Sequence, residues 1–199
     1  MHVLDAIDGW MLPPDLQSKY HNDLAALSVV WFGLEHLYST VLNCERAVAD
    51  QFRPGGQFRS PEAVQGQVLA RCAFDWYAVS GCNFVSLIGW IAKQAGLTTD
   101  EHQQYLRRVL PAVKIHRDKI AAHYSRHSPK DDSEALQRAS TMWFSLTQVN
   151  GRLVANAKTL SVRRKGVSSN SAALLPWSVV DTHEELRKRY AVPSAASKP

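Results

Sequence analysis

The segment Leu24–Val48 reads LAALSVVWFGLEHLYSTVLNCERAV and decides the fold. Its apolar residues recur at intervals of three and four, the spacing that places side chains on one face of an α-helix. This face is made of Leu24, Leu27, Trp31, Leu34, Tyr38, Val41, Leu42 and Val48. Pro13-Pro14-Asp15 marks a start, and Arg53-Pro54-Gly55-Gly56 ends the pattern because proline lacks an amide donor and glycine tolerates positive φ. The pattern predicts one long helical segment from about Asp15 to Phe52.

Three further helices are expected after it, each bounded by residues that start or stop helices. The clearest start is Ser60-Pro61-Glu62, where an N-cap residue precedes proline at the first helical position. Gly96 stops that helix, and Ser128-Pro129 closes the last one. These helices should cover residues 60–95, 99–109 and 111–126. Long helices joined by short connections predict an up-and-down helical bundle over residues 14–128.

The pattern changes after Ser140 to runs rich in Thr, Val, Phe and Trp. Asn150-Gly151 separates Met142–Val149 from Leu153–Val162, and Asn-Gly between apolar runs predicts a β-hairpin with a type I′ turn. A polar, basic loop over 163–170, an extended stretch over 176–180 and a short final helix over 181–190 should follow. The fold class is therefore mainly α, one domain over 1–199, with an appended hairpin and short helix at 140–192 and a loose tail at 193–199.

Composition indicates a folded domain without a membrane or secretory segment. The chain is 45% hydrophobic and 21% charged and contains six Trp, which excludes the intrinsically disordered class. The uncharged stretch Trp76–Ala92 is shorter than the roughly 20 apolar residues of a membrane span, so a buried helix is expected there. The N-terminus lacks a basic start followed by an apolar run, so no signal peptide is expected.

The cysteines indicate a reducing compartment. Cys44, Cys72 and Cys82 are odd in number, form no Cys-x-x-Cys pair and lie in apolar stretches. We expect reduced thiols in the core of a cytoplasmic protein, with no disulfide frame or zinc site. No Gly-rich phosphate loop and no dinucleotide fingerprint occur, so no cofactor is expected.

The aromatic residues of the first helices are predicted to be core. They follow helical spacing, which is more often a packing pattern than a binding surface. The members of this set are Trp31, Phe32, Trp76, Tyr77, Phe84 and Trp90.

The positive charge is unevenly distributed. Residues 1–129 hold 12 basic and 12 acidic side chains, whereas residues 130–199 hold 11 and 6, so the formal net charge of +5 belongs to the last third. Within residues 1–129, whose positive and negative charges are equal in number, residues 101–127 hold six basic and two acidic side chains and four of the eight histidines of the chain. A basic segment of this kind permits contact with nucleic acid without requiring it.

On an ideal helix, Arg117 and His123 lie on opposite sides of Ile120. A second copy of the helix, brought face to face by a two-fold axis, could close the gap between them. The string Arg117-Asp118-Lys119-Ile120-Ala121-Ala122-His123 resembles the Arg-polar-x4–6-His signature of HEPN domains (higher eukaryote and prokaryote nucleotide-binding), in the form seen in uncharacterised prokaryotic and phage-defence members. The family fold is an up-and-down helical bundle, and the resemblance covers about 60% of the chain.

The resemblance implies a metal-independent endoribonuclease of a toxin or defence system, acting as a homodimer. Arg117 would hold the scissile phosphate, Asp118 would orient the pair, and His123 would act as general acid or base while a ribose 2′-OH attacks its own phosphate. RNA and an antitoxin or other protein are the implied partners. Neighbouring residues that could contact the nucleic acid are Lys114, His116, Lys119, Arg126 and His127.

Other interpretations of the same residues stay open. Arg117 and Asp118 could pair structurally within the bundle, in a non-catalytic HEPN-like module that binds a nucleotide, a nucleic acid or a protein. His116, His123 and His127 are spaced so that two of them could share an ion, but no carboxylate or thiol nearby completes a site, so no metal is expected. The basic run Arg163-Arg164-Lys165 is expected to be a solvated loop, with a phosphate contact as the alternative.

Overall fold

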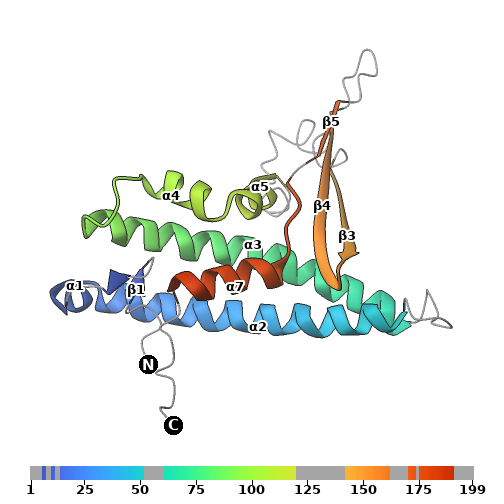
Figure 1. Cartoon of the computed structure of the whole chain (residues 1–199), viewed down its shortest axis with the longest axis horizontal. Helices are drawn as coiled ribbons and strands as arrows, with labels where there is room; N and C mark the ends of the chain where they lie inside the picture. Colours follow the sequence, from blue (N-terminus) through green and yellow to red (C-terminus); the bar gives the residue numbers. More distant parts are fainter. Residues whose placement is uncertain are drawn as a thin grey trace, which may run out of the picture.

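Two long antiparallel helices form the frame of the molecule. The computed structural model describes residues 6–7, 10–11, 14–51, 61–119, 142–161, 170–173 and 175–190. Helices α2 (His21–Gln51) and α3 (Pro61–Gln94) lie side by side, and the short α1 (Pro14–Lys19) leads into α2 (Figure 1). The described part of the chain is mainly helical with small antiparallel sheets, which confirms the predicted fold class at that level.

The buried face of α2 is the one that its sequence periodicity predicts. Its fully or almost fully buried members are Leu24, Leu27, Trp31, Leu34 and Val41. They meet a matching face of α3, where the rings of Trp31 and Phe84 lie 5.3 Å apart. Burying a side chain of this size stabilises a fold by about 1.5–3 kcal/mol. The α2–α3 contact is therefore the centre of the hydrophobic core.

Two short helices cover α3. Helices α4 (His102–Val109) and α5 (Pro111–Lys119) lie on α3, on the side away from α2 (Figure 1). Tyr105 of α4 packs directly on Gly89 of α3, where a Cβ atom would lie 2.7 Å from the tyrosine ring. Glycine is therefore needed at position 89 for α4 to approach this closely.

Local signals predicted most helix ends. α3 begins at Pro61 and ends at Gln94, two residues before Gly96, which has a φ of +70°. The predicted third and fourth helices are α4 and α5. The predicted continuation of the fourth helix to Arg126, and with it the end of the predicted bundle core at residue 128, lies outside the described residues.

The predicted hairpin is present and has a third strand. Strands β3 (Met142–Val149) and β4 (Arg152–Ser161) pair antiparallel, and Asn150 and Gly151 have φ values of +50° and +81°, as a type I′ turn requires. Strand β5 (Asn170–Ala173) adds to β4, so the predicted loop over 163–170 is wrong at Asn170. A small hairpin of β1 (Ala6–Ile7) and β2 (Trp10–Met11) was not predicted.

The final helix is part of the bundle rather than an appendage. Helix α7 (Val179–Tyr190) begins two residues before the predicted start and runs along the α2–α3 pair (Figure 1). Its inner face is fully or almost fully buried and consists of Val179, Val180, His183, Leu186 and Tyr190. The interpretation of 140–192 as an appendage is therefore wrong for its helix, because α7 completes the core that α2 and α3 leave open.

Several residues predicted to be core are exposed. Phe32 and Trp76 are 66% and 68% exposed and Trp90 is 41% exposed, whereas Trp31, Tyr77 and Phe84 are buried as predicted. Cys44 and Cys82 are buried, but Cys72 is exposed. Helical spacing identified these residues as apolar faces of helices, but it could not show that α3 has apolar side chains on its outer face as well.

Other predictions meet the structure only in part. The tail at 193–199 and the basic run at 163–165 lie outside the described residues. Within the described residues, His21–Ala47 of α2 is long and apolar enough to cross a membrane by length and composition, a property shared by core helices of soluble proteins. The predicted buried stretch Trp76–Ala92 lies in α3 and is a core helix with one exposed face.

Candidate functional site

Three charged side chains of the predicted motif region gather on α5. Arg117 donates from Nε and Nη2 to Oδ1 of Asp118, at 2.9 and 2.7 Å. Lys114, one helical turn earlier, donates to Oδ2 of the same carboxylate. The side chains are 19%, 37% and 11% exposed for Arg117, Asp118 and Lys114 respectively. The structure thus brings together three of the predicted site residues, with one carboxylate between two cations.

The charges in this cluster are set by its geometry. Partial burial opposes the charged form of Asp118, but hydrogen bonds from Lys114 and Arg117 outweigh it and lower the pKa of the carboxyl. The cluster therefore carries a net charge of about +1 near neutral pH. Within the described residues, the pair with Asp118 uses Nε and Nη2 of Arg117 and not Nη1, so the carboxylate holds the guanidinium in one orientation.

Cys82 of α3 lies next to this cluster. Burial raises the pKa of its thiol to about 12. The positive charges of Arg117 and Lys114 lower this pKa, and the negative charge of Asp118 raises it, but burial is the largest effect. A thiol with this pKa is protonated at neutral pH and is a poor nucleophile. We therefore assign Cys82 to the core beneath the cluster and not to its chemistry.

His116 faces the protein interior and not the Arg117 side of α5. Its side chain is 2% exposed, and Nε2 lies 2.9 Å from Oδ1 of Asp75 on α3. The edge of its ring packs on Trp177, with centroids 5.2 Å apart. Buried in this way, His116 joins α5 to α3 and to the segment before α7. The prediction that it contacts nucleic acid does not fit this position.

The remaining predicted site residues are not placed by the structure. His123, Arg126 and His127 lie outside the described residues, and only the backbone of Lys119 is described. Among the described residues, no group of three or more His, Cys, Asp or Glu side chains is arranged to hold a metal ion.

A buried polar cluster at His183 was not predicted. Nδ1 of His183 lies 3.0 Å from the hydroxyl of Tyr77, and Nε2 lies 3.3 Å from Oε1 of Glu35. Burial raises the pKa of Tyr77 well above its usual value, so Tyr77 keeps its proton and can donate to Nδ1. Arg187 hydrogen-bonds the Glu35 carboxylate through Nε, at 3.0 Å, and through Nη2, and its guanidinium lies over the ring of Tyr38.

This cluster joins α7 to both long helices. The ring of His183 stacks on Trp31, with centroids 4.9 Å apart. Burial opposes the charged form of Glu35, but its hydrogen bonds to Arg187 help to outweigh it, and the pKa of the carboxyl is lowered. His183 is fully buried, so it cannot reach a substrate on the surface. We assign the cluster to positioning of α7.

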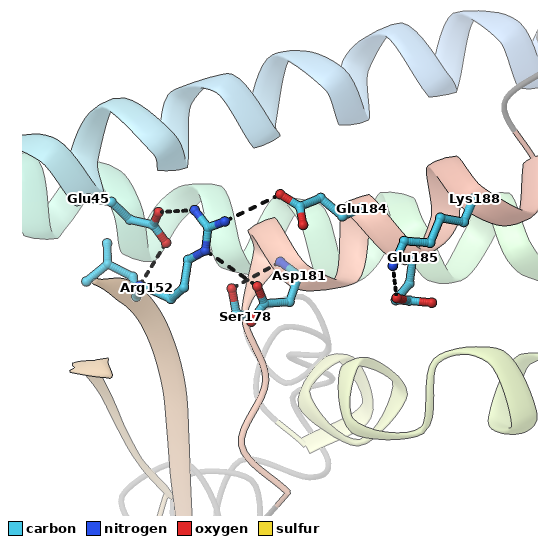
Figure 2. Close-up of polar contacts among 8 residues, drawn as sticks. Glu45, Arg152, Ser178, Asp181, Glu184, Glu185 and Lys188 are labelled. Atoms are coloured by element: carbon cyan, nitrogen blue, oxygen red, sulfur yellow. Dashed lines mark hydrogen bonds and ion pairs between the residues drawn. The ribbon is translucent and has the colours of Figure 1, made fainter. Parts of the chain in front are cut away.

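A second polar cluster fixes the hairpin to the bundle (Figure 2). Arg152 of β4 lies between Glu45 of α2 and Asp181 and Glu184 of α7, with ion-pair distances of 3.3, 3.5 and 3.4 Å. The buried Glu45 carboxylate also accepts the backbone N–H of Leu153, at 2.8 Å. Burial raises the pKa of Glu45 despite these bonds. The cluster holds the turn end of the hairpin against α2 and α7, with one guanidinium shared by three carboxylates.

One cavity opens between α7 and the α4–α5 junction. It has a volume of about 330 Å³ and is lined mainly by apolar side chains of residues 109–113 and 176–178, with Asp181, Glu185 and Arg189 at its polar edge. The indole N–H of Trp177 is buried without a hydrogen-bond partner in the described part of the chain. Lys114, Arg117 and Asp118 are not among the residues that line the cavity, so it forms no common site with them.

Sequence signals could have indicated the α5 cluster but not the other two. Lys114, Arg117 and Asp118 are one, three or four residues apart on one helix, so helical geometry alone brings them together. His183 and Tyr77 are 106 residues apart, and no local pattern relates them. No protein-family model, no curated protein and no solved structure matches this chain.

Proposed function

We propose that this protein is a HEPN-like domain that cleaves RNA without a metal ion, as a homodimer. The observation that supports the proposal is the arrangement of Arg117 on α5, held by two hydrogen bonds to the adjacent Asp118 while Lys114 binds the other carboxylate oxygen. A guanidinium fixed in one orientation binds a phosphate with less loss of conformational freedom than a freely rotating one. His123, six residues further along the chain, would supply the proton-transfer group.

The proposed reaction needs no group beyond the substrate and these side chains. His123 accepts the proton of a ribose 2′-OH while the oxygen attacks the adjacent phosphorus. The bond from phosphorus to the 5′ oxygen breaks, and that oxygen takes up the proton that His123 accepted. The products are a 2′,3′-cyclic phosphate and a free 5′-OH. Arg117 stabilises the negative charge that develops on the phosphoryl oxygens.

A non-catalytic HEPN-like module is the second candidate, and one observation favours it. The side chain of Arg117 is only 19% exposed and already has a carboxylate partner within the same protomer. A pair of this kind can serve to stabilise α5 alone. In that case the protein would bind a nucleic acid, a nucleotide or a protein partner without cleaving RNA.

RNA cleavage in the presence of EDTA separates the two candidates. The purified full chain is incubated with end-labelled RNA, together with Arg117→Ala and His123→Ala. The matched controls are Arg107→Ala and His102→Ala, which alter exposed residues of the same basic segment on α4. A nuclease should lose at least about 100-fold in rate in both motif variants, since general acid–base catalysis contributes about 10²–10⁴-fold. The controls should stay within about twofold.

Two outcomes would reject the nuclease. One is RNA that stays intact with wild-type protein, and the other is equal cleavage by wild type and both motif variants. Intact RNA combined with a salt-dependent shift of RNA mobility, weakened in Arg117→Ala, would support the binding module. Circular dichroism of each variant shows that a loss of cleavage does not come from unfolding.

A further inference from the structure

The outer face of the α2–α3 pair exposes large apolar side chains. Trp76 is 68% exposed, Leu69 51% and Trp90 41%, all on α3. On α2, Val29 is 70% exposed. Isolated exposed apolar residues are common on protein surfaces, but a continuous set of them on one face marks an interaction site. The positions of these residues show that they form such a set.

Both helices repeat along this face with a period of seven residues. The repeating positions of α3 hold large side chains at three of four places, and those of α2 hold small ones throughout. The α3 row is Leu69, Trp76, Asn83 and Trp90, and the α2 row is Ala26, Gly33, Thr40 and Ala47. None of the eight side chains is charged. A seven-residue period keeps side chains on one face of helices that pack with the slight left-handed crossing of helical bundles.

The α2 row lies on the side of α2 away from α7, and the α3 row lies about 80–140° around its helix from Tyr77, which faces His183 of α7. Trp31, Glu35 and Tyr38 of α2 face α7, since they contact His183 or Arg187 of that helix. At about 100° per residue, Gly33 and Thr40 fall on the opposite side of α2. A Cβ atom added at Gly33 would meet no atom within 4 Å, so this side is open.

Large residues on α3 are level with small residues on α2. The ring contacts Trp31–Phe84 and Tyr20–Trp90, with centroids 5.3 and 5.7 Å apart, set the antiparallel register of the two helices. In antiparallel helices, residues at the same level have residue numbers with a nearly constant sum, and here the two contacting pairs add to 110–115. Thr40 is therefore level with Trp76, and Ala26 with Trp90, to within about two residues. Each large side chain of the α3 row therefore lies beside a small residue of the α2 row at the same level along the helix axes.

We propose that a second copy of this chain packs on the outer α2–α3 face, around a two-fold axis parallel to the helices. Such an axis lays α2 of one copy on α3 of the other, antiparallel and at the same level. Trp76 then packs on Thr40 of the partner subunit, Asn83 faces Gly33 of the partner subunit, and Trp90 packs on Ala26 of the partner subunit. The contact is self-complementary, as a two-fold interface requires.

The size and charge of the face suit a dimer of this chain. From Ala26 to Ala47 the face is about 32 Å long at 1.5 Å per residue, and two helices about 10 Å apart give a width of about 20 Å. Roughly 600 Å² per copy, or about 1,200 Å² in total, reaches the lower end of stable interfaces. A face without charges meets its own copy without repulsion.

This interface is inferred from α2 and α3 and does not depend on RNA cleavage. A dimer that leaves RNA intact would reject the nuclease and keep the interface. Cleavage of RNA by a monomeric protein would reject both the interface and the homodimeric form of the nuclease. The proposal that the chain cleaves RNA would then remain.

The molecular mass of the full chain in solution is the first test. Light scattering after size exclusion, at micromolar concentrations, should give twice the 22.2 kDa of one chain. Trp76→Glu places a charge in the centre of the interface and should weaken dimerisation at least ~30-fold, the effect of a hot-spot residue. Val149→Glu alters an equally apolar residue on the hairpin that is 50% exposed, and should leave the dimer intact.

Cysteine cross-linking tests the geometry. In the proposed packing Cys72, which is exposed on α3, is level with Asn43 of α2 in the partner subunit. Asn43→Cys should therefore form a covalent dimer under mild oxidation, reversed by dithiothreitol, whereas wild type, Val149→Cys and Asn43→Cys combined with Cys72→Ser should not. A monomeric mass for wild type at all concentrations would overturn the proposal. So would dimers of Trp76→Glu as stable as those of wild type, or a chain that stays with the membrane fraction until detergent is added.

Discussion

At His183, burial and a nearby carboxylate act on one imidazole in opposite directions. Burial favours the neutral ring and is the larger effect, while the Glu35 carboxylate, 3.3 Å from Nε2, favours the protonated one. Arg187 adds to the effect of burial, and Glu184 acts with Glu35. The result is a lowered pKa, so the ring is neutral at pH 7. The folded protein therefore holds a neutral histidine where an unfolded chain would titrate near pH ~6.5.

Stability should fall as the pH decreases below about 7, through this residue. Between the unfolded pKa and the lower folded pKa, only the unfolded chain binds a proton, so protonation favours unfolding, by at most about 1.4 kcal/mol per pH unit. His183→Gln removes the titration, so the difference in unfolding free energy between wild type and variant should shrink from pH 7 to pH 5. Urea denaturation at several pH values measures it. A difference that stays constant or grows with acidification would contradict the assignment.

Residue contacts could be predicted from the sequence only where the chain is locally regular. Arg117, Asp118 and Lys114 lie on one helix, and the motif already drew attention to them. His116 lies on that helix too, but its inward orientation depends on Asp75 and Trp177, which come from other elements. The predicted nucleic-acid contact at His116 does not fit its buried position for that reason.

At the scale of elements, the approach of α4 to α3 depends on one glycine. Tyr105 lies over Gly89, and the two tyrosines Tyr105 and Tyr190 join α4 to α7 through their hydroxyls, 3.0 Å apart. A side chain at position 89 would have to displace the buried ring of Tyr105. The cost of such overpacking is typically about 1–3 kcal/mol.

Two glycine-to-alanine variants on the same helix should have opposite effects. Gly89→Ala should lower the free energy of unfolding by about 1–3 kcal/mol, because its Cβ would lie 2.7 Å from the Tyr105 ring. Gly66→Ala, where a Cβ meets no atom within 4 Å, should raise it by up to about 1 kcal/mol through helix propensity. Denaturant unfolding of both variants provides the measurement. Equal effects of the two substitutions would show that α4 does not pack tightly at position 89.

Element boundaries were predictable where one or two residues carry the signal. Pro61 and Gly96 bracket α3, and Asn150-Gly151 forms the turn of the hairpin, each because of its own backbone preference. Strand β5 escaped prediction because its four residues, NSAA, have no strand pattern of their own and are ordered by pairing with β4. Such pairing is a tertiary contact and has no local signal.

At the scale of the molecule, α7 completes the core. Four apolar residues of this helix are fully or almost fully buried against the rest of the bundle. At about 1.5–3 kcal/mol for each, their burial is comparable with the whole stability of a typical domain, about 5–15 kcal/mol. The bundle is therefore not expected to be stable without its C-terminal helix.

Removal of α7 should abolish cooperative folding. A chain that ends at Ser178 should lose its thermal unfolding transition, measured by circular dichroism. A chain that ends at Tyr190 retains α7 and is the length control, and it should keep the transition. A cooperative transition in the shorter chain would show that the chain before α7 folds without that helix.

The sequence by itself determined the helices, their main turns and the cluster on α5, because each depends on residues within a few positions of one another. It did not determine that α7 belongs to the core, that His183 meets Tyr77 and Glu35, or that Trp76 and Trp90 lie on an outer face. Apolar spacing reveals which faces of a helix are apolar. Which of these faces is covered depends on where the other helices pack. Only the tertiary structure decided this, because packing brings together residues that no local pattern relates.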